Sequence, residues 1–255
     1  MALDEAILDA VGKGASLPTL RLYTWQPPCL SLGYAQTVKD VDRESLMNEG
    51  WELVRRPTGG RALLHTDELT YAVIGPSSEP RLMGSVLDCY RNLAGALLGV
   101  LELLGLSAHI KEHPMNPARK DQPGPVCFEI PSDYEILAND KKIIGSAQSR
   151  KGQGVLQHGS LPLCGDITRI TKVLVFTNDD SLILASQRMT ARATTLAEAL
   201  GHTTCWDTLV QAFINSFQEK LHLDLLPAEP TSDEIARATI LVQEKYGNPS
   251  WTERV

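Results

Sequence analysis

Short strand-like runs occur in two groups along this chain, and this pattern constrains the fold more than any other feature. In both groups, β-branched and aromatic residues recur between proline and glycine residues. Two groups of strands separated by a helix and a loop, then followed by helices, predict a sheet-centred α/β (α+β) fold. We expect mixed, largely antiparallel sheets flanked by helices. The predicted strands are 20–25, 29–32, 52–55, 69–74, 134–137, 142–147 and 155–163.

Helical spacing of apolar residues predicts the remaining elements. A first amphipathic helix is expected over 1–11, a second over 86–104 and a third over 206–221. Thr231 and Glu234 form a capping-box pattern for a last helix that reaches about Tyr246. Tight turns are expected at Asn139-Asp140 and around 152–154.

The segment from Lys111 to Val126 contains prolines at positions 114, 117, 123 and 125 together with several charges. Such a composition supports neither helical periodicity nor strand alternation. Long irregular connections inside a domain are usually binding loops. We therefore expect a long loop here, and this loop leads directly to Cys127.

Length and charge limit the classes of function. A chain of 255 residues suits one large domain, which we take as 1–255. The formal net charge of -7 argues against nucleic-acid binding. No apolar run reaches about eighteen residues, and the first twenty residues do not follow the order of a signal peptide. We expect a cytoplasmic protein that does not act on membranes.

The five cysteines are Cys29, Cys89, Cys127, Cys164 and Cys205. Their odd number and wide spacing, without any CxxC pair, argue against a disulfide framework and against a structural zinc site. Free cysteine commonly serves as a small buried hydrophobe. A cysteine is therefore a catalytic candidate only if a motif surrounds it.

The segment RRPTGGRALLH, residues 55–65, combines paired glycines with three arginines. Paired glycines let the backbone approach a ligand and direct N–H groups at an anion, and arginines supply positive charge. The segment on its own is equally consistent with a tight hairpin whose arginines are solvated.

Two further segments contain candidate residues. In KKIIGSAQ, residues 141–148, strand alternation would place Lys142 and Ile144 on one face. Lys142 is either a solvated surface lysine or a buried group that orients a carbonyl or moves protons. In LQHGSL, residues 156–161, His158 could pair with a thiol, although a histidine within a strand is more often structural.

Taken in order, RRPTGGRALLH, CFEIPSDYEI, KKIIGSAQSRKGQGVLQHGSL and the closing KYGNPSW resemble the biotin/lipoate A/B protein ligase family. The resemblance begins at MALDEAI and runs over nearly the whole chain. It is closest to the cysteine-dependent octanoyltransferase branch of Gram-positive type, and it implies the catalytic-domain fold of that family. Family members usually have a further strand before the MALDEA helix, whereas this sequence starts at that helix, so we expect either that the start codon is assigned late or that this N-terminal edge strand is absent.

The resemblance implies which residues act. It places the catalytic cysteine at Cys127 and an active-site lysine at Lys142, with no metal. Cys164 is the nearest rival nucleophile, but it lies outside the matched motifs. The better-known octanoyltransferase branch has its cysteine later, and no cysteine occurs between Gly165 and Thr204. The residues implied to line the acyl and substrate pocket are Arg56, Thr58, Gly59, Gly60, Arg61, His65, Gly145, Ser146, Ala147, His158 and Gly159.

The implied reaction is ping-pong transfer of an octanoyl group from octanoyl-acyl carrier protein to a lysine. The acceptor would be an apo lipoyl domain or glycine cleavage H protein, and the enzyme a monomer that needs no cofactor. One alternative is a lipoate-protein ligase that makes a lipoyl-adenylate from ATP, with Mg. A second alternative is a noncatalytic protein that binds lipoyl domains or lipoate.

Overall fold

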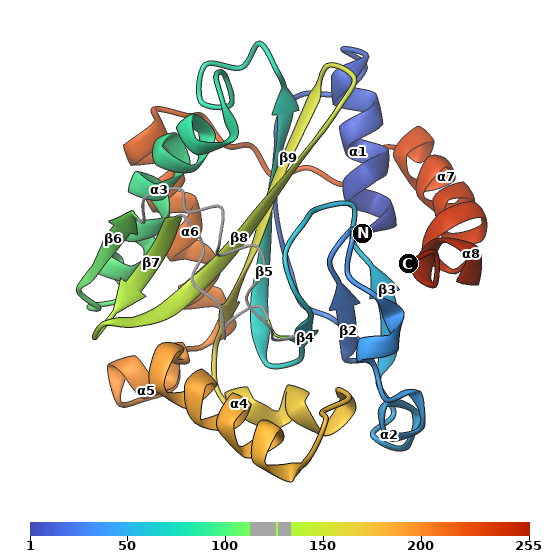
Figure 1. Cartoon of the computed structure of the whole chain (residues 1–255). Coiled ribbons are helices and arrows are strands. Elements are labelled where there is room, and N and C mark those ends of the chain that lie inside the picture. The colour runs from blue at the N-terminus through green and yellow to red at the C-terminus, as the bar shows by residue number, and fades with distance from the viewer. Residues whose placement is uncertain (113–125, 127–133) are drawn as a thin grey trace.

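A six-stranded antiparallel sheet forms the centre of the fold (Figure 1). We describe it from a computed structural model, which covers residues 1–112, 126 and 134–255. Each neighbouring pair of strands in the order β1-β5-β9-β8-β7-β6 is antiparallel. The strands are β1 (Thr19–Tyr23), β5 (Glu68–Pro76), β6 (Ala108–Glu112), β7 (Tyr134–Ala138), β8 (Lys141–Lys151) and β9 (Gly154–Pro162).

A second, three-stranded sheet contains the remaining strands, in the order β3-β2-β4. Strand β2 (Cys29–Leu32) runs parallel to β3 (Glu52–Arg55) and antiparallel to β4 (Leu63–His65). The two sheets together are thus mixed and largely antiparallel, which confirms the prediction from the sequence.

Helices cover both faces of the large sheet. Helix α1 (Ala2–Gly12) lies on the face that also approaches the small sheet, and its apolar residues pack against Ile74 and Leu156. Helices α3 (Val86–Leu103) and α6 (Trp206–Leu221) lie together on the other face and complete the largest hydrophobic core. The amphipathic patterns at 1–11, 86–104 and 206–221 therefore predicted the helices that bury the sheet.

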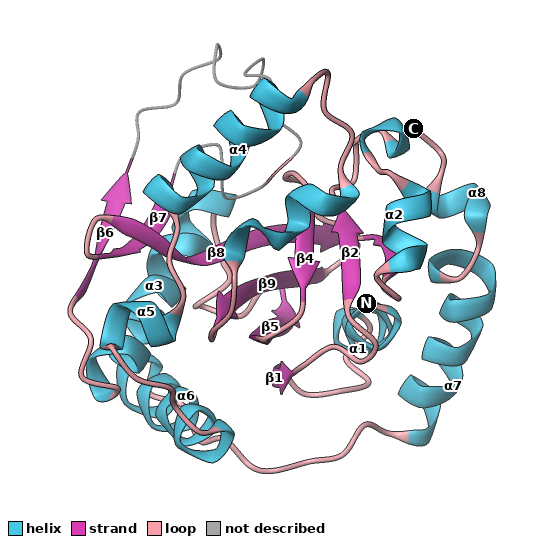
Figure 2. Ribbon diagram, turned by 90° about the horizontal axis from the view of Figure 1, so that it is seen from below, coloured by secondary structure: helices cyan, strands magenta, loops and turns pink. Residues whose placement is uncertain are grey.

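The other helices surround the sheets on the outside (Figure 2). The last long helix, α7 (Ser232–Leu241), begins where the sequence predicts, because Thr231 and Glu234 make both hydrogen bonds of a capping box. The helices not yet named are α2 (Arg43–Asn48), α4 (Asp179–Arg192), α5 (Leu196–Leu200) and α8 (Pro249–Thr252), with 3-10 helices at Val38–Asp40 and Ile167–Val173 and a π-helix at Val242–Tyr246.

Two connections show where the local sequence predicts the structure correctly and where it does not. Asn139 and Asp140 both have positive φ, at 50° and 60°, as a two-residue hairpin turn requires. The loop predicted from Lys111 starts too early, because β6 continues to Glu112 by pairing with β7. Pairing with a distant strand overrides the local sequence there. The rest of that predicted loop, from 113 to 125, lies outside the described residues.

A β-bulge interrupts the pairing of β7 with β8. Ile136 lies opposite Ile144, but its neighbour Leu137 lies opposite Lys142, so that Ile143 is an extra residue. A bulge breaks the strict alternation of side chains along a strand. The prediction that Lys142 and Ile144 share a face is therefore wrong, and this has consequences for the site.

No helix in the described part of the chain is long and apolar enough to cross a membrane.

A buried carboxylate joins α1 to the C-terminal region. Glu5 accepts hydrogen bonds from Lys151 at 2.8 Å, from Lys245 at 2.6 Å and from the hydroxyl of Tyr246 at 2.5 Å. Burial raises the pKa of Glu5, but the hydrogen bonds from the two lysines and the tyrosine outweigh burial and lower the pKa from 4.5 to about 2. The ionised form of Glu5 therefore stabilises the fold.

We expect Glu5→Gln to lower the free energy of unfolding at pH 7 by roughly 2 kcal/mol, because charged hydrogen bonds are lost. The pKa of Glu5 is depressed in the folded state, so its contribution is complete above pH 4.5 and is lost as the pH falls toward about 2. The difference between variant and wild type in urea unfolding should shrink over that range. Glu219→Gln, at a side chain 69% exposed, is the control. A difference that persists unchanged at pH 2 would contradict this account.

Candidate active site

The glycine-paired turn and strand β9 are joined by a buried hydrogen bond. Thr58 Oγ1 lies 2.7 Å from His158 Nε2, although the two residues are 100 positions apart in the sequence. Burial, the largest effect, lowers the pKa of His158 from 6.5 to about 3, so that its imidazole is neutral at pH 7. His158 Nδ1 is buried and has no hydrogen-bond partner among the described residues.

Two arginines of the turn donate hydrogen bonds to backbone carbonyl groups of the protein. Arg55 is fully buried and donates to the carbonyl oxygens of Gly33, Gln36 and Thr252. Arg56 donates to the carbonyl oxygens of Gly59 at 3.0 Å and Arg61 at 2.6 Å, which closes the turn. The interpretation of these arginines as solvated is wrong for Arg55 and Arg56, because their guanidinium groups satisfy carbonyl groups that would otherwise be buried without donors. Arg61 itself is half-buried.

Gly60 and Gly33 bring two segments of the protein's own backbone into close contact. Gly60 has a positive φ of 97°, which favours glycine. A Cβ atom on Gly33, at the end of β2, would lie 1.8 Å from the carbonyl oxygen of Gly60. A Cβ atom on Gly59 would have no atom within 4 Å. The backbone of the turn thus rests directly on the backbone after β2.

We expect Gly33→Ala to destabilise the protein by about 3 kcal/mol or more, because the added methyl group collides with a fixed carbonyl group. Gly59→Ala, in the same turn, is the matched control and should change the free energy of unfolding by less than about 0.5 kcal/mol. Urea unfolding of the two variants tests this difference. Equal stability of the two alanine variants would show that the turn moves freely.

His65 belongs to a buried polar network beside the turn. Its Nε2 atom lies 2.8 Å from Ser31 Oγ, and its Nδ1 atom lies 2.6 Å from Glu68 Oε1. Ser31 in turn accepts a hydrogen bond from Arg56. Glu68 is also hydrogen-bonded by Ser160. Both ring nitrogens of His65 are engaged within the protein, so this residue positions the turn through Ser31 and Arg56.

Lys142 is buried and forms an ion pair. Its Nζ atom lies 3.1 Å from Glu135 Oε1, and the two side chains are 6% and 10% exposed. Tyr134 and Ile136, which flank Glu135 on β7, line a cavity next to α3. Alternation therefore directs Glu135 to the opposite face of the sheet, and Lys142 with it. The interpretation of Lys142 as a solvated surface residue is wrong.

The other predicted residues of β8 and β9 divide between the two faces. Ala147 lies opposite His158 in the ladder, and Gly145 lies opposite Ser160. Ser146 lies on the α3 face, where its hydroxyl is 2.6 Å from that of Tyr71. A Cβ atom on Gly159 would lie 2.5 Å from Tyr71 as well, which places Gly159 at a close contact on that same face. The structure thus does not bring Ser146 and Gly159 together with Thr58.

Cys127, the predicted nucleophile, lies outside the described residues, between Val126 and residue 134. The other four cysteines are free. Cys29 and Cys89 are buried, whereas Cys164 and Cys205 are exposed. Burial raises the pKa of the Cys29 thiol to about 12, which makes it unreactive at neutral pH.

Among the described residues, no group of three or more His, Cys, Asp or Glu side chains could hold a metal ion.

Comparison with known proteins assigns the family. The family model of the lipoyl protein ligase A/B catalytic domain matches residues 1–218. The chain belongs to this family. It is 38% identical over 257 residues to octanoyltransferase LipM of Symbiobacterium thermophilum, and the match covers 100% of this chain and 93% of that protein. It is 34% identical over 258 residues to octanoyltransferase LipM of Staphylococcus aureus, with 100% and 93% covered.

Solved structures of lipoate-protein ligases share the fold of this lipoyl protein ligase A/B domain. A crystal structure of lipoate-protein ligase A bound with ATP is 25% identical, with a TM-score of 0.79 and coverage of 99% of this chain and 92% of that one. A putative lipoate protein ligase from Thermoplasma acidophilum with bound lipoic acid is 26% identical, with a TM-score of 0.77 and coverage of 100% and 92%. The fold predicted from the motifs is confirmed.

The sequence analysis did not identify several residues that build the site. Glu135 stands inside the matched CFEIPSDYEI motif, and its spacing from Lys142 across the Asn139-Asp140 turn could have identified it as a partner. Ser31 lies within hydrogen-bond distance of His65 and accepts a hydrogen bond from Arg56 of the turn, and Glu68 connects to Ser31 through His65. Such contacts between distant strands are visible only once the register is known.

Proposed function

We propose that this chain is an octanoyltransferase that acts through a thioester on Cys127. The donor is octanoyl-acyl carrier protein, and the acceptor is a lysine of a lipoyl domain or of glycine cleavage H protein. The observation that carries the proposal is the similarity, over the full length of the chain, to proteins named octanoyltransferase LipM. The proposal includes a cytoplasmic location and one catalytic domain over 1–255.

In the first half-reaction, the thiolate of Cys127 attacks the carbonyl carbon of the octanoyl thioester, and the sulfur of the carrier leaves as a thiolate that takes up a proton from water. One thioester replaces another, so the free energy changes little. In the second half-reaction the acceptor amine attacks the carbonyl carbon and forms an amide. The Cys127 sulfur leaves and takes up a proton, which restores the enzyme, and amide formation makes the sequence irreversible.

Lys142 is the charged group that we assign to this chemistry. An ordinary thiol is only slightly ionised at pH 7, and a neighbouring ammonium group favours the thiolate. The ion pair with Glu135, 3.1 Å away, compensates the charge of Lys142 inside the protein. The neutral His158 and the turn around Thr58 form a polar surface from which water is excluded. Hydrogen bonds to a developing oxyanion are stronger in such a place than in water.

A lipoate-protein ligase is the second candidate, because the chain also resembles lipoate-protein ligase A bound with ATP over 99% of its length. Such an enzyme would form a lipoyl-adenylate from lipoate and ATP and would not depend on Cys127. A noncatalytic protein that binds lipoyl domains is the third.

One assay separates the three. The protein is mixed with octanoyl-acyl carrier protein and an apo lipoyl domain, without nucleotide, and the acceptor is followed by mass spectrometry. We expect octanoylation of the acceptor without ATP. Modification that requires free lipoate, ATP and magnesium would establish the ligase. Binding of the acceptor without modification under either condition would establish the third function.

A further inference from the structure

The loop 33–36, which follows β2, contacts the glycine-paired turn through its backbone. The N–H group of Tyr34 donates to the carbonyl oxygen of Thr58 at 2.9 Å. Gly33, in the same loop, is in close contact with the turn as well. Thr58 is the residue of the turn whose hydroxyl lies 2.7 Å from the ring of His158 on β9. The position of Tyr34 therefore affects where Thr58 lies relative to the central sheet.

Arg254 contacts both the backbone and the ring of Tyr34. Its Nη2 atom donates to the carbonyl oxygen of Tyr34 at 2.7 Å. Its guanidinium carbon lies 3.7 Å from the centroid of the Tyr34 ring and 4.0 Å from the centroid of the Trp251 ring. An aromatic face attracts a cation, and a charged donor strengthens a hydrogen bond. These contacts together restrain the loop at Tyr34.

The segment that carries Arg254 is itself attached to the small sheet. The buried side chain of Arg55, on β3, donates to the carbonyl oxygen of Thr252 through Nε at 3.0 Å and through Nη2 at 2.7 Å. The indole N–H of Trp251 donates to the carbonyl oxygen of Arg55 at 2.9 Å. Hydrogen bonds in both directions thus join α8 to β3. Arg254, which follows α8, therefore reaches Tyr34 from a fixed position.

The sequence alone does not indicate this contact. The family model matches residues 1–218, so Arg254 lies beyond the matched part of the chain. Arg254 and Tyr34 are also 220 positions apart. Only the fold brings the segment after α8 to the loop that supports the turn.

We propose that Arg254 is a positioning residue for octanoyl transfer, an inference that rests on the proposed function. Arg254 restrains Tyr34, and the N–H group of Tyr34 restrains Thr58 beside His158. Arg254 acts through Tyr34 and makes no contact with the acyl group. Displacement by about 1 Å within a site can lower a rate by about 10²-fold. Loss of the guanidinium group therefore slows the reaction.

Hydrogen exchange tests the restraint without an assay of activity. In Arg254→Met, the amide of Tyr34 should exchange at least about tenfold faster than in the wild type, because the loop opens locally. The buried amide of Thr194, which donates to the carbonyl oxygen of Lys142 at 3.1 Å, should keep its rate. An unchanged rate at Tyr34 would overturn the proposal. Equal acceleration at both amides, or failure of the variant to fold, would also overturn it, because Arg254 would then stabilise the whole domain.

The rate of octanoyl transfer tests the positioning role. It is measured with octanoyl-acyl carrier protein and an apo lipoyl domain, at a temperature at which all variants are folded. Arg254→Met should be slower than the wild type by at least about fivefold. Arg254→Lys should come within about twofold of the wild type, because its ammonium group still donates to Tyr34 and faces the ring. A wild-type rate in Arg254→Met, or a loss that lysine does not repair, would overturn the proposal.

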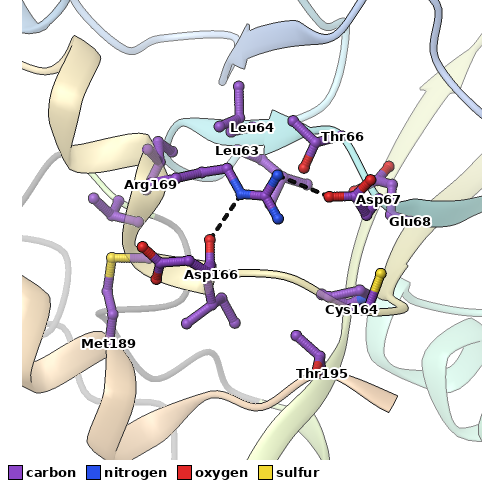
Figure 3. A pocket seen from close by; sticks show the side chains of 14 residues that line it. Leu63, Leu64, Thr66, Asp67, Glu68, Cys164, Asp166, Arg169, Met189 and Thr195 are labelled. Carbon is purple, nitrogen blue, oxygen red and sulfur yellow. Dashed lines mark hydrogen bonds and ion pairs between the residues drawn. The ribbon is translucent and has the colours of Figure 1, made fainter. Parts of the chain in front are cut away.

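Two other arginines provide matched controls. Arg43 forms an ion pair at 2.7 Å with Glu253 of the same segment, and Arg43→Met should keep the wild-type rate of transfer. Arg169 forms an ion pair at 2.7 Å with Asp67 beside a small pocket, as Figure 3 shows. Neither Arg43→Met nor Arg169→Met should change exchange at Tyr34. Faster exchange there in either control would overturn the proposal, because loss of any arginine contact would then loosen the loop.

The inference and the proposed function fail in different ways. If the wild-type protein does not transfer octanoyl, the proposed function is wrong. If the wild-type protein is active and exchange at Tyr34 is unchanged in Arg254→Met, only the role of Arg254 is refuted.

Discussion

Replacement of Cys127 by alanine is expected to reduce octanoyl transfer by at least about 10³-fold, because the covalent route needs the sulfur atom that forms the thioester. The wild-type protein incubated with octanoyl-acyl carrier protein alone should gain the mass of one octanoyl group. The Cys127→Ala variant should gain none. Intact-protein mass spectrometry measures both.

The remaining thiols provide the controls. Cys164→Ser and Cys205→Ser remove the two exposed thiols and should leave the acyl-enzyme and the overall rate unchanged. An octanoyl group found on Cys164 in the wild-type protein, with activity retained in Cys127→Ala, would transfer the catalytic role to the rival cysteine.

Replacement of Lys142 by methionine is expected to lower the rate of acyl-enzyme formation by at least about 10²-fold, the usual contribution of a positioned acid–base group. The variant should also lose on the order of 3 kcal/mol of stability, because Glu135 remains buried without the ammonium group 3.1 Å away. Single-turnover acylation measures the first effect, and urea unfolding measures the second.

The double variant Lys142→Met with Glu135→Gln separates the two effects. Removal of both charges should restore most of the stability, since no uncompensated carboxylate remains, while acylation stays slow. If the double variant recovered acylation together with stability, Lys142 would be a structural residue and its assignment to the chemistry would be wrong.

Local sequence patterns predict the elements whose conformation depends on residues close together in the chain. Helix α6 begins at Trp206 and ends at Leu221, as its apolar stripe indicates. The turn at Asn139 and Asp140 follows from two residues that tolerate positive φ. By contrast, β6 was predicted as partly loop, because its strand character comes from pairing with β7 and not from its own residues.

The site was less predictable than the fold, for the same reason. The motifs indicated that Thr58 and His158 belong together, but not that a hydrogen bond joins them. They implied that Arg56 lines the substrate pocket, which stays a prediction, but not that its guanidinium group holds the carbonyl groups of its own turn. The face of β8 on which Ser146 lies cannot be predicted by alternation from Lys142, because a β-bulge lies between the two residues.

The bulge in β8 determines on which face of the sheet the side chain of Lys142 lies relative to that of Ile144. Ile143 shifts the phase of the strand by one residue between Lys142 and the glycine at position 145. Loss of the Ile143 codon would remove the bulge and leave Lys142 opposite Leu137 and Ile144 opposite Ile136, with each side chain on its present face. A regular ladder that kept all the residues would instead place Lys142 on the face of Ile144, toward the apolar interior beneath α3. A shorter strand without a bulge and a longer strand with one therefore hold the ammonium group in the same direction, so one residue can be lost or gained here without moving it.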